Sequence, residues 1–117
     1  MNDIIKNMLI GLGINPVYAG FRYLVEAILV TIDKLESEPE MTTRDLQMEV
    51  ANRTGQNIWN VERRTRSIIN IAFENPKDEL LELFRPYLNK RTGTVGTKCF
   101  ARVIAIKCIA ERSMNEQ

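Results

Sequence analysis

The apolar residues of this chain recur every three or four positions, which is the spacing of one face of an α-helix. Residues 3–12 carry such a stripe, which ends at Gly11 and Gly13, and Gly13 fits a left-handed helix cap. Residues 17–36 carry a longer stripe, and the Asn-Pro pair at 15–16 is a typical helix start. The first third of the chain therefore predicts a short helix followed by a long, largely buried one.

The remainder of the chain carries further apolar stripes of helical spacing. They are bounded by residues that start or stop helices, and they predict helices over residues 43–52, 58–74, 76–84 and 97–112. Thr42 and Thr43 are capping candidates for the first of these, an Asn-Pro pair at 75–76 opens the third, and Thr97 caps the last. The residues that we expect to face inward on the last helix are Phe100, Val103, Ile104, Ile106, Cys108 and Ile109. No segment alternates as a strand does, so the predicted fold class is all-α, with about six helices in a single domain over residues 1–117.

Two of the predicted helices are joined by a tight polar turn. Residues 43–52 and 57–74 flank a turn at 53–56 that contains one glycine, Gly55. A short helix, a short turn with glycine and a second helix form the helix-turn-helix arrangement of many DNA-binding proteins. The sequence thus predicts a helix-turn-helix over about residues 43–74, although many helical bundles contain such a pair.

Polar side chains gather at the start of that second helix and on one face of its first half. They are Gln56, Asn57, Asn60, Glu62, Arg63, Arg66 and Ser67. In a recognition helix such residues meet base edges in the major groove, where Arg reads guanine, Asn or Gln reads adenine, and Glu accepts from cytosine. The alternative is a solvated helix face with local ion pairs such as Glu62–Arg66. We interpret Trp59 as a partly buried packing residue and not as a stacking platform.

Charge is balanced over the whole chain but not along it. Sixteen Lys and Arg stand against fifteen Asp and Glu in 117 residues, and the net charge of +1 excludes a bulk polycation. Residues 85–110 carry six basic side chains and no acid, whereas residues 33–49 carry six acids and two bases. We therefore expect Lys90, Arg91 and Lys98, together with Arg66 of the helix, to contact DNA phosphates. For the loop that carries Lys90 and Arg91, mere solvation is the alternative.

Several functions are excluded by what the sequence lacks. Histidine is absent, which removes the most common general base and a principal zinc ligand, and no phosphate-binding glycine motif occurs. We therefore expect no enzyme, no metal site and no cofactor. Cys99 and Cys108 lie too far apart on one helix to form a disulfide, and we interpret them as small buried residues of a protein in a reducing cytoplasm. There is no apolar run long enough to span a membrane and no secretory leader after Met1, which favours a cytoplasmic protein without a membrane partner.

Two stretches resemble a known family of DNA-binding domains. Residues 13–16 (Gly-Ile-Asn-Pro) and 20–28 (Gly-Phe-Arg-Tyr-Leu-Val-Glu-Ala-Ile) are similar to the opening of the effector domain of sporulation initiation response regulators. That opening runs Gly-x-Pro, one place shorter than here, and then Gly-Tyr-x-Tyr-Leu-Arg-Glu-Ala-Ile. Residues 61–63 (Val-Glu-Arg), with Arg66 and Ile69, resemble the family's recognition-helix run Arg-Val-Glu-Arg-Ala-Ile-Arg-His-Ala-Ile. With a weaker likeness in the last helix, the resemblance covers nearly the whole chain.

The resemblance implies a six-helix domain that binds a short box similar to TGTCGAA through the second helix of its helix-turn-helix. By position, Glu62, Arg63 and Arg66 match family residues at or beside the DNA. Asn60 replaces the family's Arg, which shifts the expected preference toward adenine, and Ser67 replaces its His. The family's phosphoacceptor receiver domain is not recognisable here. Head-to-tail binding on adjacent boxes implies a homodimer that is weak or forms only on DNA.

The sequence therefore predicts a transcription regulator of the sporulation effector type that binds double-stranded DNA, with RNA polymerase as a further candidate partner. The alternative is a helical protein-interaction module that keeps the fold without binding DNA. Salt-dependent binding to duplex DNA distinguishes the first function from the second.

Overall fold

The computed structural model describes residues 1–115, and in them it places six α-helices and one 3-10 turn. These elements are α1 (Asn2–Gly11), α2 (Gly20–Lys34), α3 (Thr43–Thr54), α4 (Ile58–Glu74), α5 (Asp78–Phe84), η1 (Arg85–Tyr87) and α6 (Thr97–Asn115). No strand occurs in this part of the chain, and the predicted all-α class is confirmed.

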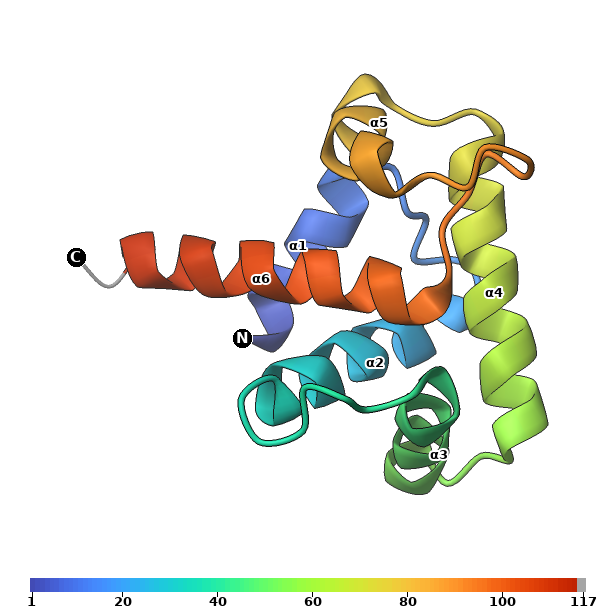
Figure 1. Cartoon of the computed structure of the whole chain (residues 1–117), viewed down its shortest axis with the longest axis vertical. Helices are drawn as coiled ribbons and strands as arrows, with labels where there is room; N and C mark the ends of the chain where they lie inside the picture. The colour runs from blue at the N-terminus through green and yellow to red at the C-terminus, as the bar shows by residue number, and fades with distance from the viewer. Residues whose placement is uncertain (116–117) are drawn as a thin grey trace.

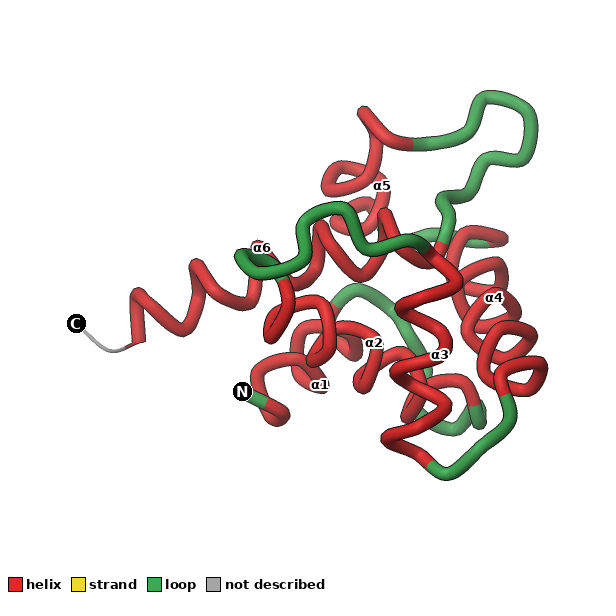
Figure 2. The backbone as a smooth tube through the Cα atoms, turned by 60° about the horizontal axis from the view of Figure 1, so that its bottom comes forward, coloured by secondary structure: helices red, strands yellow, loops and turns green. Residues whose placement is uncertain are grey.

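Helix α2 forms the centre of the molecule, because α1, α3, α4 and α6 all pack against it. In Figure 1, α6 runs across the body toward α4, which stands upright along one side with α3 at its lower end and α5 near its upper end. Figure 2 shows that the loop between α5 and α6 projects from the body, while Thr94 near its end donates to Asn70 Oδ1 of α4 over 3.4 Å. The fold thus leaves one long side of α4 and the neighbouring loop at the edge of the molecule.

An aromatic cluster joins the three helices of the carboxy-terminal half. The rings of Phe84 from α5 and Phe100 from α6 are stacked with their centroids 4.9 Å apart. Phe73 from α4 meets both rings edge-on, at 5.7 and 6.5 Å. Such pairs stabilise a core beyond the burial of their area, so this cluster ties α4 to the rest of the domain.

The starts of α2 and α5 differ from the prediction, because both Asn-Pro pairs lie before the helix that we expected them to open. Asn15 Oδ1 accepts a hydrogen bond from Val17 N–H over 2.9 Å, and α2 begins only at Gly20. The backbone angles of Asn75 are not helical, because a residue that precedes proline avoids helical angles. Helix α5 therefore begins only at Asp78.

The end of α1 is closed as the sequence predicts. Gly13 has a φ of 94°, and Ile14 N–H donates to the oxygen of Leu9 over 2.9 Å. Leu9 and Ile14 both belong to the buried apolar core, so the hydrogen bond closes the helix between two core residues.

Helix α6 is longer and more exposed than predicted. It begins at Thr97 itself, while the oxygen of Gly96 accepts from Phe100 N–H over 3.0 Å. Ile106 and Ile109 are 53% and 37% exposed, and their predicted inward position is wrong. The reason is that Ile106 and Ile109 lie on another side of α6 than its buried residues Ala101, Ile104, Ala105 and Cys108.

Candidate DNA-binding surface

Helix α3, the turn after it and α4 form the helix-turn-helix that the sequence predicts, although α3 ends two residues later than expected. A capping box starts α3: Thr42 Oγ1 accepts from Asp45 N–H (3.1 Å), and Asp45 Oδ2 accepts from Thr42 N–H (3.2 Å). Gly55 ends the helix with a φ of 68°, a conformation that glycine adopts without steric cost. Asn57 then caps α4 through a 2.9 Å hydrogen bond from Asn60 N–H to its Oδ1. The start of α3 and both ends of the turn are thus determined locally.

The inner side of α4 is held by close packing against the core. Val61, Ile68 and Ile69 are buried there. Gly20 of α2 lies so near that a Cβ atom at this position would stand 2.3 Å from the backbone oxygen of Arg64. Because any side chain on Gly20 would push the two helices apart, this contact sets the position of α4.

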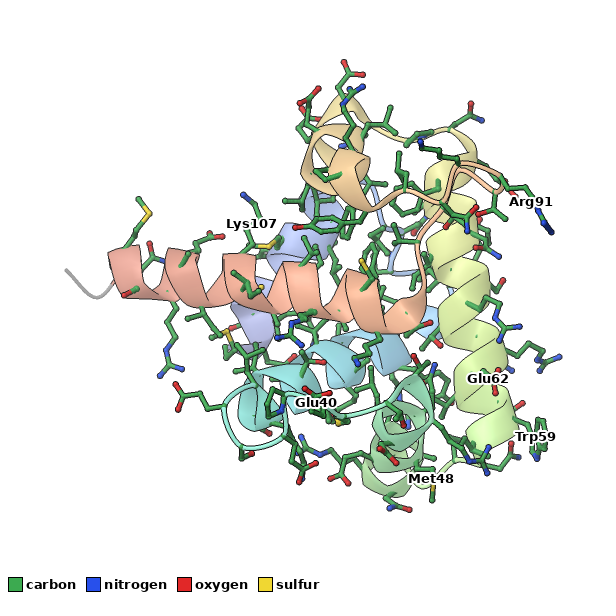
Figure 3. The ribbon with its side chains drawn as sticks, in the orientation of Figure 1. Glu40, Met48, Trp59, Glu62, Arg91 and Lys107 are labelled. Carbon is green, nitrogen blue, oxygen red and sulfur yellow. The ribbon has the colours of Figure 1, made fainter. Side chains whose placement is uncertain are left out.

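The outer side of α4 is an open surface of mostly polar side chains. Its residues are Trp59, Asn60, Glu62, Arg63, Arg66, Ser67, Asn70, Ile71 and Glu74. The predicted residues from Asn60 to Ser67 are therefore brought together on one face, while Gln56 and Asn57 precede it in the turn. Figure 3 shows Trp59 and Glu62 on the lower half of α4, at the edge of the molecule.

Two hydrogen bonds order the arginines of this face. Arg63 Nη2 donates to Asn60 Oδ1 over 3.2 Å. Arg66 Nη2 donates to Glu62 Oε1 over 2.6 Å. The Glu62–Arg66 ion pair of a solvated helix face is therefore present. An exposed pair of this kind contributes only about 0.3–0.5 kcal/mol, and the guanidinium can exchange its carboxylate for a phosphate at little cost. The pair is therefore compatible with DNA binding.

The loop between α5 and α6 presents the basic residues Lys90 and Arg91. Asn89 organises it: its Oδ1 accepts from Arg91 N–H (2.8 Å) and Thr92 N–H (3.2 Å), and its N–H donates to the oxygen of Thr94 (2.9 Å). Lys90 and Arg91 are both exposed, and Arg91 points outward in Figure 3. The loop is thus held by its own hydrogen bonds, and it presents two positively charged side chains to the solvent.

A polar cleft of about 390 Å³ connects this loop to the helix-turn-helix. Thr43 of α3, Glu62, Arg66 and Asn70 of α4, and several loop residues line it. The helix-turn-helix and the loop therefore share one concave surface.

Lys98 lies elsewhere, and the charge separation along the sequence is partly lost in space. Lys98 and Arg102 line a small cavity with Lys34 and Glu38, and Arg102 donates to the oxygen of Pro39 over 3.4 Å. The basic segment thus meets the acidic segment at this point. Of the predicted phosphate contacts in residues 85–110, Lys90 and Arg91 remain beside α4.

Trp59 is the residue of this surface for which the prediction from the sequence is wrong. Its side chain is 75% exposed, whereas we expected a partly buried packing residue. The exposure of Trp59 could have been predicted from the helical repeat. Trp59 precedes Arg63 by four positions and Arg66 by seven, and it therefore shares their face. Asn70, one further turn along, was missed for the same reason.

The two cysteines are the thiols of the described residues, and both are at least partly buried. Burial raises the pKa of Cys99, and burial together with the nearby Glu111 raises the pKa of Cys108 to about 11. Both cysteines are free, and at neutral pH they stay protonated. Within residues 1–115 no three His, Cys, Asp or Glu side chains gather as metal ligands, and none of the helices there is long and apolar enough to cross a membrane.

Comparison with known families agrees with this geometry. The family model described as sporulation initiation factor Spo0A C terminal matches residues 5–108. No curated protein matches the chain. The family match confirms the resemblance seen in the opening motif and in the recognition-helix run. The chain belongs to the family of Spo0A C-terminal domains, and is thus a DNA-binding effector domain of transcription and not an enzyme.

Proposed function

We propose that this domain binds duplex DNA sequence-specifically by placing α4 in the major groove. Arg63 and Asn60 read base edges. Glu62 helps to select the bases or to orient the side chains that read them. The main support is the outer side of α4, where amide and guanidinium groups lie on a helix whose opposite side is packed into the core. A helix held in this way presents its donors in a defined geometry.

Contacts to the DNA backbone come from the same concave surface. Arg66 exchanges Glu62 for a phosphate, and the exposed loop residues Lys90 and Arg91 bind phosphates beside the groove. We leave Lys98 out of this interface because it lies with Arg102 near the loop that precedes α3.

The box that this domain prefers is proposed to differ from the family box TGTCGAA. Asn60 stands where the family run has Arg, and an amide pairs with adenine whereas a guanidinium pairs with guanine. Selection of bound duplexes from a random pool tests this directly. We expect a single short box with adenine at the position that faces Asn60, and recovery of unaltered TGTCGAA would contradict the proposed reading.

Salt dependence is the second test of this function. The logarithm of the affinity should fall linearly with the logarithm of the salt concentration, with a slope of about −0.9 for each phosphate contacted. A scrambled duplex of equal length is the control, and it should retain the salt dependence with lower affinity. A flat salt response would exclude this mode of binding.

Assembly and partners follow from the same proposal. We propose that two copies bind head to tail on adjacent boxes, and that the homodimer is weak or absent without DNA. We propose RNA polymerase as a further partner of the DNA-bound domain.

A further inference from the structure

Trp59 occupies the amino-terminal end of α4, where a recognition helix approaches DNA most closely. It is the second residue of α4 and the single tryptophan of the chain. Its side chain is 75% exposed, and Figure 3 shows it at the outer edge of the helix, away from the body of the domain. The core therefore does not explain this large apolar side chain.

The position of Trp59 matters more than its exposure, since single exposed apolar residues are common on protein surfaces. Trp59 lies one turn before Arg63 and two turns before Arg66, and it lines the same open surface as both arginines. When Arg63 reaches a base edge, the indole therefore reaches the groove as well.

In the major groove, the apolar group available to such a side chain is the C5-methyl group of thymine. An indole offers a large, rigid apolar surface that loses little conformational entropy on binding. We propose, on the basis of the DNA-binding mode above, that Trp59 is a specificity-determining residue that packs on a thymine methyl group next to the base read by Arg63. The exposed indole of Trp59 thus contacts a base pair that contains thymine.

The experiment replaces each thymine of the selected box, one at a time, by deoxyuridine, which lacks only the methyl group. Affinity is measured by fluorescence anisotropy of labelled duplexes for the unaltered protein and for Trp59→Ala. In the unaltered protein, one replacement should lower the affinity about fourfold, the change that corresponds to one buried methyl group. Trp59→Ala should bind the unaltered box about tenfold more weakly and should show no further loss with that deoxyuridine.

Met114→Ala is the matched control variant. Met114 is 74% exposed, like Trp59, but it lies near the carboxy-terminal end of α6, far from α4 in Figure 1. This variant should keep both the affinity and the deoxyuridine effect. The fluorescence of the single tryptophan is an independent readout, and it should be quenched by the selected duplex and shielded from acrylamide.

The proposal is overturned if no deoxyuridine position affects the unaltered protein, or if Trp59→Ala keeps the effect. It is also overturned if Trp59→Ala loses only the cooperativity between two adjacent boxes, because the indole then contacts a second copy of the chain. Any of these three results overturns only the role of Trp59. The proposed DNA-binding mode still stands as long as Arg63→Ala weakens binding to the box. If duplex binding depends neither on salt nor on Arg63, both proposals fail together.

Discussion

The side-chain amide of Gln47 in α3 donates a hydrogen bond from Nε2 to Oγ1 of Thr65 in α4, over 3.2 Å. Thr65 Oγ1 donates in turn to the backbone oxygen of Val61 over 2.8 Å. Gln47 is 2% exposed and Thr65 is completely buried. This buried chain of hydrogen bonds joins the two helices of the helix-turn-helix and so defines how α4 lies on α3.

Thr65→Val is therefore expected to destabilise the domain. Valine keeps the shape of threonine but leaves the amide of Gln47 buried without its acceptor, which costs about 1–3 kcal/mol of unfolding free energy. Gln47 Oε1 is already buried without a hydrogen-bond partner, so the double variant Gln47→Met/Thr65→Val should recover most of the loss. Urea unfolding of Thr65→Val, of Gln47→Met and of the double variant measures the coupling between the two side chains. Equal stability of Thr65→Val and the unaltered protein would show that the hydrogen bond contributes nothing.

Gly20→Ala tests the contact that positions α4. The added Cβ would meet the oxygen of Arg64 at 2.3 Å, and we expect a loss of about 1–3 kcal/mol of unfolding free energy together with weaker DNA binding. Gly11→Ala is the control, since its Cβ would meet nothing within 4 Å. It should leave the stability unchanged or raise it by up to about 1 kcal/mol. If both variants behave alike in urea unfolding, close approach at Gly20 does not position the helix.

Arg63→Ala and Arg91→Ala separate base reading from phosphate contact. Loss of the Arg63 guanidinium should cost about 1–3 kcal/mol of binding free energy on the selected box and relax the preference at one position. Loss of Arg91 should weaken all duplexes about equally and reduce the magnitude of the salt slope by about one unit. Both side chains are exposed, so neither change should alter folding. Titrations against the selected and a scrambled duplex measure both effects. If Arg63→Ala weakens both duplexes by one factor, Arg63 contacts a phosphate instead.

The capping box of α3 predicts a pH dependence. Hydrogen bonds from the Thr42 side chain and backbone lower the pKa of Asp45 below its ordinary value of 3.8. Because the folded-state pKa is the lower one, the contribution to stability is present above the unfolded-state pKa and is lost as the pH falls through the folded-state pKa. In Thr42→Ala, an NMR titration of the Asp45 carboxyl carbon should show the pKa moving back up. Thr43→Ala, one residue along, should leave it in place, and an unchanged pKa in Thr42→Ala would contradict this role of the cap.

Assembly should depend on DNA. We expect sedimentation velocity to show a monomer in the absence of DNA, and two copies on a duplex that carries two adjacent boxes. A duplex with one box is the control and should hold one copy. A tight dimer without DNA would be incompatible with the proposed head-to-tail arrangement.

The local signals of this sequence were sufficient for the helix boundaries that depend on near neighbours. Thr42 and Asp45 form their capping box within four residues, and Gly55 needs only its own backbone to end α3. The face that carries Asn60 and Arg63 follows from the helical repeat alone. For this reason the helix-turn-helix and most of its polar face were predictable without the fold.

Tertiary packing decided the features for which one local signal permits two outcomes. An Asn-Pro pair suits a helix start and a segment outside the helix equally well, and in the folded chain α2 begins only at Gly20, the residue that meets the backbone of Arg64. Apolar character predicts burial, but Trp59 and Ile106 are exposed where no other helix covers them. Charges that are separate along the chain, such as Lys98 and Glu38, line one small cavity because α6 packs beside the loop before α3. A sequence determines which side chains an element presents, whereas contact with another element depends on distances that only the folded chain defines.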